Sequence, residues 1–354
     1  MINKILCCLM ALLITAPLYA AKDSSTYSAF DKRIQYTGRI HWGNPQGPVM
    51  WAPGAYMDIA FEGSYCILEI TDEYRYGINH NFLVIQVDDA APTRIALKEK
   101  HNRIVLARHL TPGKHRISIC KATEAEIGYL QPTAIITPKL LRLPRKAKRK
   151  IEFIGDSITA GMGNDSSTTP CGKGGWYLQH NAWLAYGPRT ARALNAQWHL
   201  SAISGIGLVH SCCNKSTVMP PLYKKLSLSA DSLDWDFKQY QPSVISICLG
   251  ENDGIQDSAT FCKAYIQFLQ QIRATNPHAT LILLSSPMSG GAKKAFQQKM
   301  IQAVYEAVLP ADKKMGYYIF DKQYNAGCTY HPSAKEHAQI AAELTRYLRK
   351  RMKW

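Results

Sequence analysis

The chain has 354 residues, of which 46% are hydrophobic and 19% are charged, and its formal net charge is +16. This apolar content excludes a disordered chain, and the scattered 23 glycines and 18 prolines exclude a collagen-like or low-complexity protein. At roughly 100–200 residues per domain, the length predicts two globular domains.

A long apolar run at residues 5–16 follows Lys4 close to the amino terminus. It is shorter than the roughly 20 residues that a bilayer-crossing helix needs. Small residues at Ala20 and Ala21 precede a polar stretch, so residues 1–20 are predicted to form a cleaved signal peptide. A cut one residue later and a buried N-terminal helix are the alternatives. We expect an exported protein, periplasmic or secreted, without a membrane span.

Eight of the ten cysteines remain once the predicted signal peptide is removed. An even number of cysteines in an exported protein permits disulfides. Cys66 and Cys120, alone in the first third, either pair with each other or stay reduced, and the pairing of the other six stays open. Neither the cysteines nor the histidines show the spacing of a metal site, so no metal and no cofactor are predicted.

Part of the positive charge is clustered in residues 145–150 and 349–353. We interpret these clusters as a solvated linker and a helix end. Weak contact with an anionic envelope surface is the alternative. No aromatic-interleaved basic motif accompanies them, so nucleic acid is not an expected partner.

Residues 22–143 have the pattern of a β-domain. Short alternating runs recur between turn signals such as Thr111-Pro112-Gly113-Lys114, and many short strands at near-regular spacing predict an antiparallel sandwich or jelly roll. The predicted strands cover residues 56–61, 67–70, 82–87, 103–106, 115–119 and 134–136.

Residues 151–354 change to an alternation of strands and helices, and the basic residues 144–150 are the predicted linker. Such an alternation predicts a mainly parallel sheet covered by helices on both faces. Strands are expected at 151–154, 243–249 and 279–284, and helices at 182–194, at 258–274 and from near Pro332 to the end.

The strand at 151–154 runs into Gly155-Asp156-Ser157-Ile158-Thr159. Ligands bind beyond the carboxyl ends of the strands in open α/β sheets, so this turn exposes Ser157 where a substrate would sit. The segment differs from the Gly-x-Ser-x-Gly elbow because its fifth residue is Thr159. A plain helix cap is the alternative reading of Ser157.

Three later segments complete a candidate site. The segment Ser204-Gly205-Ile206-Gly207 follows a strand-like run and offers bare main-chain N–H groups. Asn252 follows the strand at 243–249, and His331 opens the last helix. A serine ester hydrolase needs a nucleophile, a base and donors for an oxyanion. Asp253 is expected to hold its loop rather than to react.

Serine, glycine, asparagine and histidine in this order resemble the SGNH (GDSL-type) hydrolases over residues 151–354. The resemblance implies a three-layer α/β/α domain in which Ser157 is the nucleophile and His331 the base. It also implies an oxyanion hole made by the N–H groups of Ser157 and Gly205 and the side chain of Asn252.

The first domain and several later segments indicate one family among the SGNH hydrolases, because they are similar to carbohydrate esterase family 2. That family implies a jelly roll before the SGNH domain and removal of O-acetyl groups from polysaccharides such as xylan and glucomannan. The segments that carry the similarity are 33–39, 61–63, 121–124, 151–157, 181–187 and 235–237.

One departure concerns the group that orients His331. SGNH hydrolases usually carry Asp three residues before the histidine, where this chain has Cys328. The histidine still needs an acceptor for its Nδ1–H. Some members of the esterase family use a main-chain carbonyl, so we expect the carbonyl of Cys328 or Thr329, with Asp321 as the rival.

Aromatic residues near these segments divide into two groups. Trp176, in a glycine-rich run, and Tyr330, beside the base, are the candidate substrate contacts, since aromatic rings can stack on sugars. Trp183 and Tyr186 lie on a helix-like segment and are expected in the core. His337 is expected to be structural.

Together these features predict an exported serine esterase that removes acetyl groups from a carbohydrate polymer through an acyl-enzyme on Ser157. Three alternatives remain open: de-O-acetylation of an envelope polymer such as peptidoglycan, a carbohydrate-binding protein with a weak esterase site, and transfer of the acyl group to another sugar.

Overall fold

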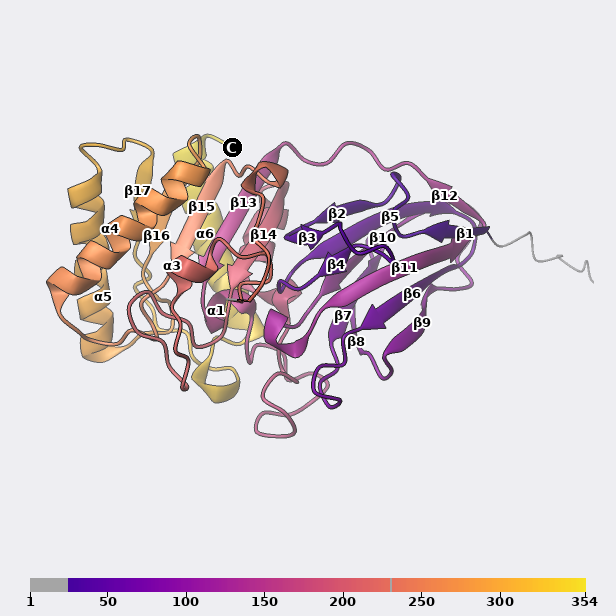
Figure 1. Cartoon of the computed structure of the whole chain (residues 1–354), viewed down its shortest axis with the longest axis horizontal. Helices are drawn as coiled ribbons and strands as arrows, with labels where there is room; N and C mark the ends of the chain where they lie inside the picture. Colours follow the sequence, from indigo (N-terminus) through magenta and orange to yellow (C-terminus); the bar gives the residue numbers. More distant parts are fainter. Residues whose placement is uncertain (1–24, 230) are drawn as a thin grey trace, which may run out of the picture.

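The computed structural model describes residues 25–229 and 231–354, so the predicted signal peptide at 1–20 lies outside the described residues. Figure 1 shows two domains side by side, a β-sandwich built from the first part of the chain and a sheet with helices built from the rest.

The first domain consists of two six-stranded antiparallel sheets. One has the order β3-β4-β11-β6-β9 with β1 added to β11, and the other has the order β12-β5-β10-β7-β8 with β2 added to β5. The strands are β1 Ser25–Ser28, β2 Gln35–Thr37, β3 Ile40–His41, β4 Val49–Met50, β5 Tyr56–Glu62, β6 Cys66–Asp72, β7 Phe82–Val87, β8 Thr93–Ala96, β9 His101–Ala107, β10 Lys114–Lys121, β11 Leu130–Thr137 and β12 Lys139–Leu141.

A hydrophobic core fills the space between these sheets. Ile59 of β5 and Ile117 of β10 pack in one cluster with Leu68 of β6 and Ile135 of β11, and all four are fully buried. Alternate residues of a strand point to opposite faces, so the alternation in the sequence supplies one apolar face to each sheet. The predicted sandwich is confirmed, and all six predicted strands are present.

The second domain is built on a five-stranded parallel sheet with the order β14-β13-β15-β16-β17. Numbered within the domain this order is 2-1-3-4-5, which places a topological switch point between β13 and β15. The strands are β13 Arg149–Gly155, β14 Ala196–Ala202, β15 Val244–Cys248, β16 Thr280–Leu284 and β17 Met315–Tyr318.

Helices cover both faces of this sheet, as the predicted three-layer α/β/α domain requires (Figure 1). Two of them, α2 and α6, pack in one core cluster, while α4 and α5 belong to the cluster on the other face. The helices are α1 Ser157–Ala160, α2 Tyr186–Ala193, α3 Met219–Leu222, α4 Ser258–Thr275, α5 Gly291–Val308 and α6 Ala334–Met352, with short 3-10 turns η1 Ala125–Ile127, η2 Ala182–Leu184, η3 Phe237–Gln239 and η4 Cys328–Tyr330. Among the described helices, none combines the length and the apolar character needed to cross a bilayer.

Some boundaries differ from the expected ones. Helix α6 begins at Ala334, two residues after Pro332, because Ser333 and Glu336 form a capping box that fixes the first turn. Strand β13 begins at Arg149, so the last two residues of the predicted basic linker pair with β14. Helix α5 and strand β17 were not predicted.

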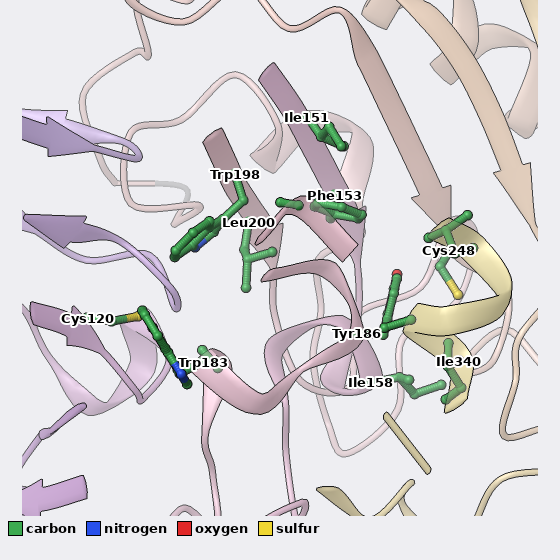
Figure 2. Packing of buried hydrophobic residues seen from close by; sticks show 14 of the residues in the cluster. Cys120, Ile151, Phe153, Ile158, Trp183, Tyr186, Trp198, Leu200, Cys248 and Ile340 are labelled. Carbon is green, nitrogen blue, oxygen red and sulfur yellow. The ribbon is translucent and has the colours of Figure 1, made fainter. Parts of the chain in front are cut away.

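The two domains share a continuous hydrophobic core. The Trp198 ring of β14 stacks on the Tyr56 ring of β5 with 4.0 Å between centroids, and its indole N–H donates to the Gly54 carbonyl at 2.9 Å. Figure 2 shows Cys120 of β10 beside Trp183 of η2, in the same cluster as Trp198 and Phe153. Burial of such large rings holds the domains in a fixed relative position.

A buried arginine adds a polar connection between the domains. Arg39 of the first domain is fully buried, and its guanidinium lies 3.6 Å from the Glu152 carboxylate of β13. It also donates to the Tyr223 carbonyl at 2.9 Å and to the Ser201 hydroxyl at 3.1 Å. A buried charge needs such partners, so Arg39 is held by groups of the second domain.

Candidate active site

Ser157 lies at the carboxyl end of β13, as the first residue of α1. Gly155 before it is required sterically, because a Cβ there would lie 2.1 Å from Thr159 Oγ1 and 2.9 Å from the Cys248 carbonyl. Asp156 caps the helix by accepting the Ile158 N–H at 3.0 Å. This tight turn places Ser157 at the switch point, where α/β sheets bind ligands.

His331 lies 174 residues after Ser157 in the chain, and the fold brings the two side chains into contact. Its Nε2 lies 2.8 Å from Ser157 Oγ, and the two residues are only 8% and 5% exposed. His331 stands between η4 and α6, so the short turn before the last helix carries the ring to the serine. This geometry suits removal of the serine proton by the imidazole.

The other ring nitrogen of His331 faces a main-chain carbonyl. Nδ1 lies 3.0 Å from the Thr329 carbonyl oxygen and 3.1 Å from the Thr329 hydroxyl oxygen, and either oxygen can accept its proton in the tautomer that leaves Nε2 free. The hydroxyl can accept because it donates its own hydrogen to the Cys328 carbonyl at 2.7 Å. Thr329 and Tyr330 both adopt left-handed backbone conformations, with φ of 52° and 60°. Two such residues in succession are costly, by roughly 1–2 kcal/mol each, and they turn the carbonyl toward the imidazole.

Of the two predicted acceptors, the structure therefore points to Thr329. The Cys328 carbonyl instead accepts the main-chain N–H of His331 at 3.1 Å. The rival Asp321 is exposed, and no hydrogen bond joins its carboxylate to His331 among the described residues.

Cys328, at the position where Asp is usual, forms a disulfide with Cys171, and their Cα atoms are 5.1 Å apart. The bond ties the histidine turn to the glycine-rich segment before Trp176. The Cys328 N–H also donates to the Gly163 carbonyl at 2.8 Å. The histidine turn is thus anchored both by a covalent bond and by the main chain.

Gly205 occupies a turn after β14 with a φ of +77°, a conformation that favours glycine. A Cβ there would lie 3.0 Å from Cys212 Sγ, and the Cys212 N–H donates to the Gly205 carbonyl at 2.8 Å. Cys212 and Cys213 form a second disulfide. Within residues 25–229 and 231–354, no acceptor bonds the N–H of Gly205 or of Ser157, so both can donate to a substrate oxygen.

Asn252 follows β15 and reaches the same end of the sheet. Its amide nitrogen donates to the Ile206 carbonyl at 2.8 Å and lies 3.3 Å from the Asp156 carboxyl oxygen. The side chain therefore joins the turns that carry Ser157 and Gly205. Both amide hydrogens are therefore engaged, and the bond to Asp156, at 3.3 Å, is the longer and weaker of the two.

Asp253 holds the neighbouring loop, as predicted. Its carboxylate accepts the main-chain N–H groups of Leu208, Val209 and His210 at distances of 2.6–3.0 Å. A carboxylate bound to three successive N–H groups fixes the path of the chain directly after the Gly205 turn.

Burial favours a neutral imidazole at His331. Burial lowers the pKa of His331 below 6.5, although the Thr329 carbonyl, the charge of Glu251 and the Cys328 carbonyl favour the protonated form. For Glu251, burial would raise the pKa, but hydrogen bonds from Lys293, Ser286 and Ser289 outweigh it and hold the pKa below its usual value. A neutral His331 is the form that acts as a base.

Glu251, which precedes Asn252, has its own partners in the structure. It accepts hydrogen bonds from the Ser289 hydroxyl at 2.5 Å and from the Lys293 ammonium on α5. Helix α5 itself was not predicted, so sequence reasoning had no partner for this carboxylate.

The structure also shows which of the remaining aromatic and histidine side chains are exposed and which are buried. Trp176 and Tyr330 are exposed at 44% and 79%, while Trp183 and Tyr186 are buried in the shared core. His337 is buried, and its Nδ1 accepts the Tyr186 N–H at 3.2 Å, as a structural histidine would.

A cavity of about 770 Å³ lies between the two domains next to this site. Trp176 lines it together with Glu124 of the first domain and Ile203 and Ile206, which flank the Gly205 turn. Ser157 and His331 are not part of its lining, so the cavity lies beside the Ser157–His331 pair. Over the described ranges, no three His, Cys, Asp or Glu side chains gather in a way that could hold a metal ion.

The fold and this arrangement define a GDSL-type hydrolase. The family model for the GDSL-like Lipase/Acylhydrolase family matches residues 153–340, and the model for the Carbohydrate esterase 2 N-terminal domain matches residues 36–144. The chain belongs to carbohydrate esterase family 2, and it is a carboxylic-ester hydrolase by its domains.

Individual relatives match over nearly the whole chain. An acetylxylan esterase / glucomannan deacetylase of Cellvibrio japonicus is 30% identical over 97% of this chain and 96% of its own length. A solved family 2 carbohydrate esterase from Cellvibrio japonicus has a TM-score of 0.85 at 27% identity, covering 94% of this chain and 99% of that one. One from Clostridium thermocellum, in complex with cellohexaose, has a TM-score of 0.83 at 28% identity, covering 91% and 99%.

Proposed function

We propose that this protein removes O-acetyl groups from an acetylated polysaccharide of the xylan or glucomannan type, through an acyl-enzyme on Ser157. The observation that carries the proposal is the 2.8 Å contact between His331 Nε2 and Ser157 Oγ at the switch point of the sheet. The substrate class rests on the acetylxylan and glucomannan activities named for relatives that cover nearly the whole chain.

In the first half of the reaction, His331 Nε2 takes the hydroxyl proton as Ser157 Oγ attacks the acetyl carbonyl carbon. The carbonyl oxygen becomes an oxyanion, which accepts from the N–H groups of Ser157 and Gly205 and from Asn252. As this intermediate collapses, the bond to the sugar oxygen breaks and His331 returns the proton to that oxygen.

In the second half, His331 takes a proton from water, and the resulting hydroxide attacks the acetyl-serine. Collapse of the second intermediate breaks the bond to Ser157 Oγ, which regains its proton from His331, and acetate leaves. The step needs neither a metal nor a cofactor, since a neutral imidazole and three donors supply the proton transfer and the charge stabilisation.

The Thr329 carbonyl takes the place of the usual carboxylate. It fixes the tautomer and the ring orientation of His331 through the contact at 3.0 Å. A carbonyl carries only a partial negative charge, so it stabilises the imidazolium less than a carboxylate would. The arrangement is a Ser–His dyad with a main-chain acceptor.

We also propose that the protein is exported by cleavage of the predicted signal peptide and acts in the periplasm or outside the cell. The Cys171–Cys328 and Cys212–Cys213 disulfides support this location, because disulfides persist in oxidising compartments.

The test compares the wild-type protein with Ser157→Ala for acetate release from acetylated xylan, acetylated glucomannan and O-acetylated peptidoglycan. We expect serine-dependent release from one or both plant-type polymers at rates above that from peptidoglycan. Preference for peptidoglycan would overturn the substrate class. Equal background rates for both proteins on all polymers and on an aryl acetate would instead indicate a carbohydrate-binding protein.

A further inference from the structure

We propose that Glu124 of the first domain is a positioning residue for the oxyanion hole: its carboxylate fixes Ser204 and thereby aims the Gly205 N–H. This inference rests on the proposed function, because it assigns Gly205 to the oxyanion hole. It makes the β-sandwich a part of the catalytic machinery rather than a neighbouring module.

The contact is direct and has two hydrogen bonds. Glu124 precedes η1 in the first domain, and its side chain reaches the turn that follows β14 in the second domain. One carboxyl oxygen accepts the Ser204 main-chain N–H at 2.6 Å, and the other accepts the Ser204 hydroxyl. Both hydrogen bonds of this carboxylate therefore go to the residue immediately before Gly205.

The Gly205 N–H lies in the next peptide plane along the chain, separated from the Ser204 N–H only by φ and ψ of Ser204. Because Glu124 holds Ser204 at both its N–H and its hydroxyl, it restrains the peptide that carries the Gly205 N–H. Gly205 has a φ of +77°. Glycine adopts positive and negative φ about equally readily, so its backbone preference alone does not hold the Gly205 peptide in one orientation. On the other side of the turn, the Cys212 N–H holds the Gly205 carbonyl at 2.8 Å. Glu124 supplies the restraint on the N–H side.

Glu124 is itself held rigidly. The Lys121 ammonium, which is fully buried, donates to the main-chain carbonyls of Glu124 at 2.8 Å and of Thr123 at 2.7 Å. The Ile127 N–H donates back to the Glu124 carbonyl at 3.2 Å. These bonds fix the main chain before η1, from which the Glu124 side chain extends.

The titratable groups around the carboxylate come from both domains. Burial raises the pKa of Glu124 to about 7 and lowers that of Lys121 to about 7. His180 Nδ1 lies 3.3 Å from the carboxylate, and burial lowers the pKa of His180 to about 3, so its ring is neutral. Glu126 and Lys215 line the same cavity, and the charge of Glu126 raises the pKa of Glu124 while that of Lys215 lowers it.

The domains are also joined by contacts that do not involve this buried carboxylate. The Trp198–Tyr56 stack and the Arg39–Glu152 pair already join the domains elsewhere along β14 and β13. Burying a carboxyl group is unfavourable unless it is hydrogen-bonded. Here both hydrogen bonds are formed with Ser204. The turn is the one that presents Gly205 to the substrate.

The experiment measures kcat and KM on an aryl acetate for wild type, Glu124→Ala, Glu124→Gln, Glu124→Asp and Glu73→Ala, each corrected for active sites titrated with an organophosphorus ester. Glu73 is the matched control, because it lines the same cavity but accepts the Tyr129 N–H within its own domain. Ser157→Ala tests the proposed function in the same series.

For Glu124→Ala we expect kcat to fall about 10- to 100-fold with KM nearly unchanged, a part of the loss seen when an oxyanion donor is removed. Glu124→Asp is one methylene too short to reach the Ser204 N–H, so we expect a similar loss even if the alanine variant does not fold. Glu124→Gln keeps an acceptor for that N–H and should retain most of kcat, as should Glu73→Ala.

The outcomes separate the two proposals. If Ser157→Ala loses activity while Glu124→Ala and Glu124→Asp keep wild-type kcat per active site, the positioning role of Glu124 is wrong and the proposed function stands. If Glu73→Ala loses as much as Glu124→Ala, the effect is structural and the inference is also overturned. If Ser157→Ala keeps full activity, the proposed function itself fails.

Discussion

Replacing Cys171 and Cys328 together by serine should destabilise the protein much more than it impairs the chemistry. The disulfide joins residues 157 positions apart. For a loop of this length the chain-entropy relation gives about 5 kcal/mol at 25 °C, and loss of native disulfides typically costs 2–5 kcal/mol. We therefore expect the free energy of unfolding to fall by about 2–5 kcal/mol.

The catalytic effect should be smaller, because the histidine turn keeps its main-chain anchors. The Cys328 N–H donates to the Gly163 carbonyl at 2.8 Å, and the Gly327 N–H donates to the His331 carbonyl at 2.7 Å. Neither bond depends on the sulfur atoms. The folded double variant should keep kcat on an aryl acetate within about tenfold of wild type, since removing one catalytic hydrogen-bond donor costs about 100-fold or more.

Urea unfolding and steady-state rates at 25 °C measure both quantities, with Cys262→Ser as the control because Cys262 is a free, half-buried cysteine. Wild-type stability in the double variant would refute the cross-link as a source of stability. A loss of kcat above about 100-fold in fully folded protein would refute the claim that these main-chain bonds suffice to position His331 without the disulfide.

Three further predictions concern the site itself. Asn252→Ala should lower kcat about 100- to 1,000-fold on any acetyl ester, as loss of an oxyanion donor does; a change below about threefold would contradict its role. Because burial lowers the pKa of His331 and the neutral ring is the base, kcat/KM should be lost as the pH falls, with a midpoint below pH 6.5; a midpoint above this value would be inconsistent with the buried dyad. Trp176→Ala should raise KM for acetylated polymer about 2- to 10-fold while leaving an aryl acetate unaffected, and equal effects on both substrates would argue against a sugar contact.

The sequence predicted those parts of the fold that depend on local patterning. Alternating residues in β5 and β10 and the apolar runs of β13 and β15 specify strands by themselves, because one or both faces must be buried. Helix α5 was missed because its buried residues, such as Met300 and Val304, are few and are separated by exposed polar residues. Its pattern alone did not distinguish it from a solvated segment.

The candidate site was foreseeable because its members stand directly after strands of one parallel sheet or before one helix. Ser157, Gly205 and Asn252 follow β13, β14 and β15, and the carboxyl ends of parallel strands meet at one edge. What the sequence could not supply were contacts between distant segments. Thr329 as acceptor depends on two left-handed residues, and Glu124 reaches Ser204 across 80 positions of the chain.

The central claim is that Ser157 is activated by His331 alone, with the Thr329 carbonyl in place of a carboxylate. The most direct test is to label the protein with an organophosphorus ester near neutral pH and locate the modified residue by peptide mass spectrometry in wild type, His331→Ala and Asp321→Asn. The account predicts a label on Ser157, formed at the wild-type rate in Asp321→Asn and far more slowly in His331→Ala. A label on another residue, or a rate that collapses in Asp321→Asn, would contradict it.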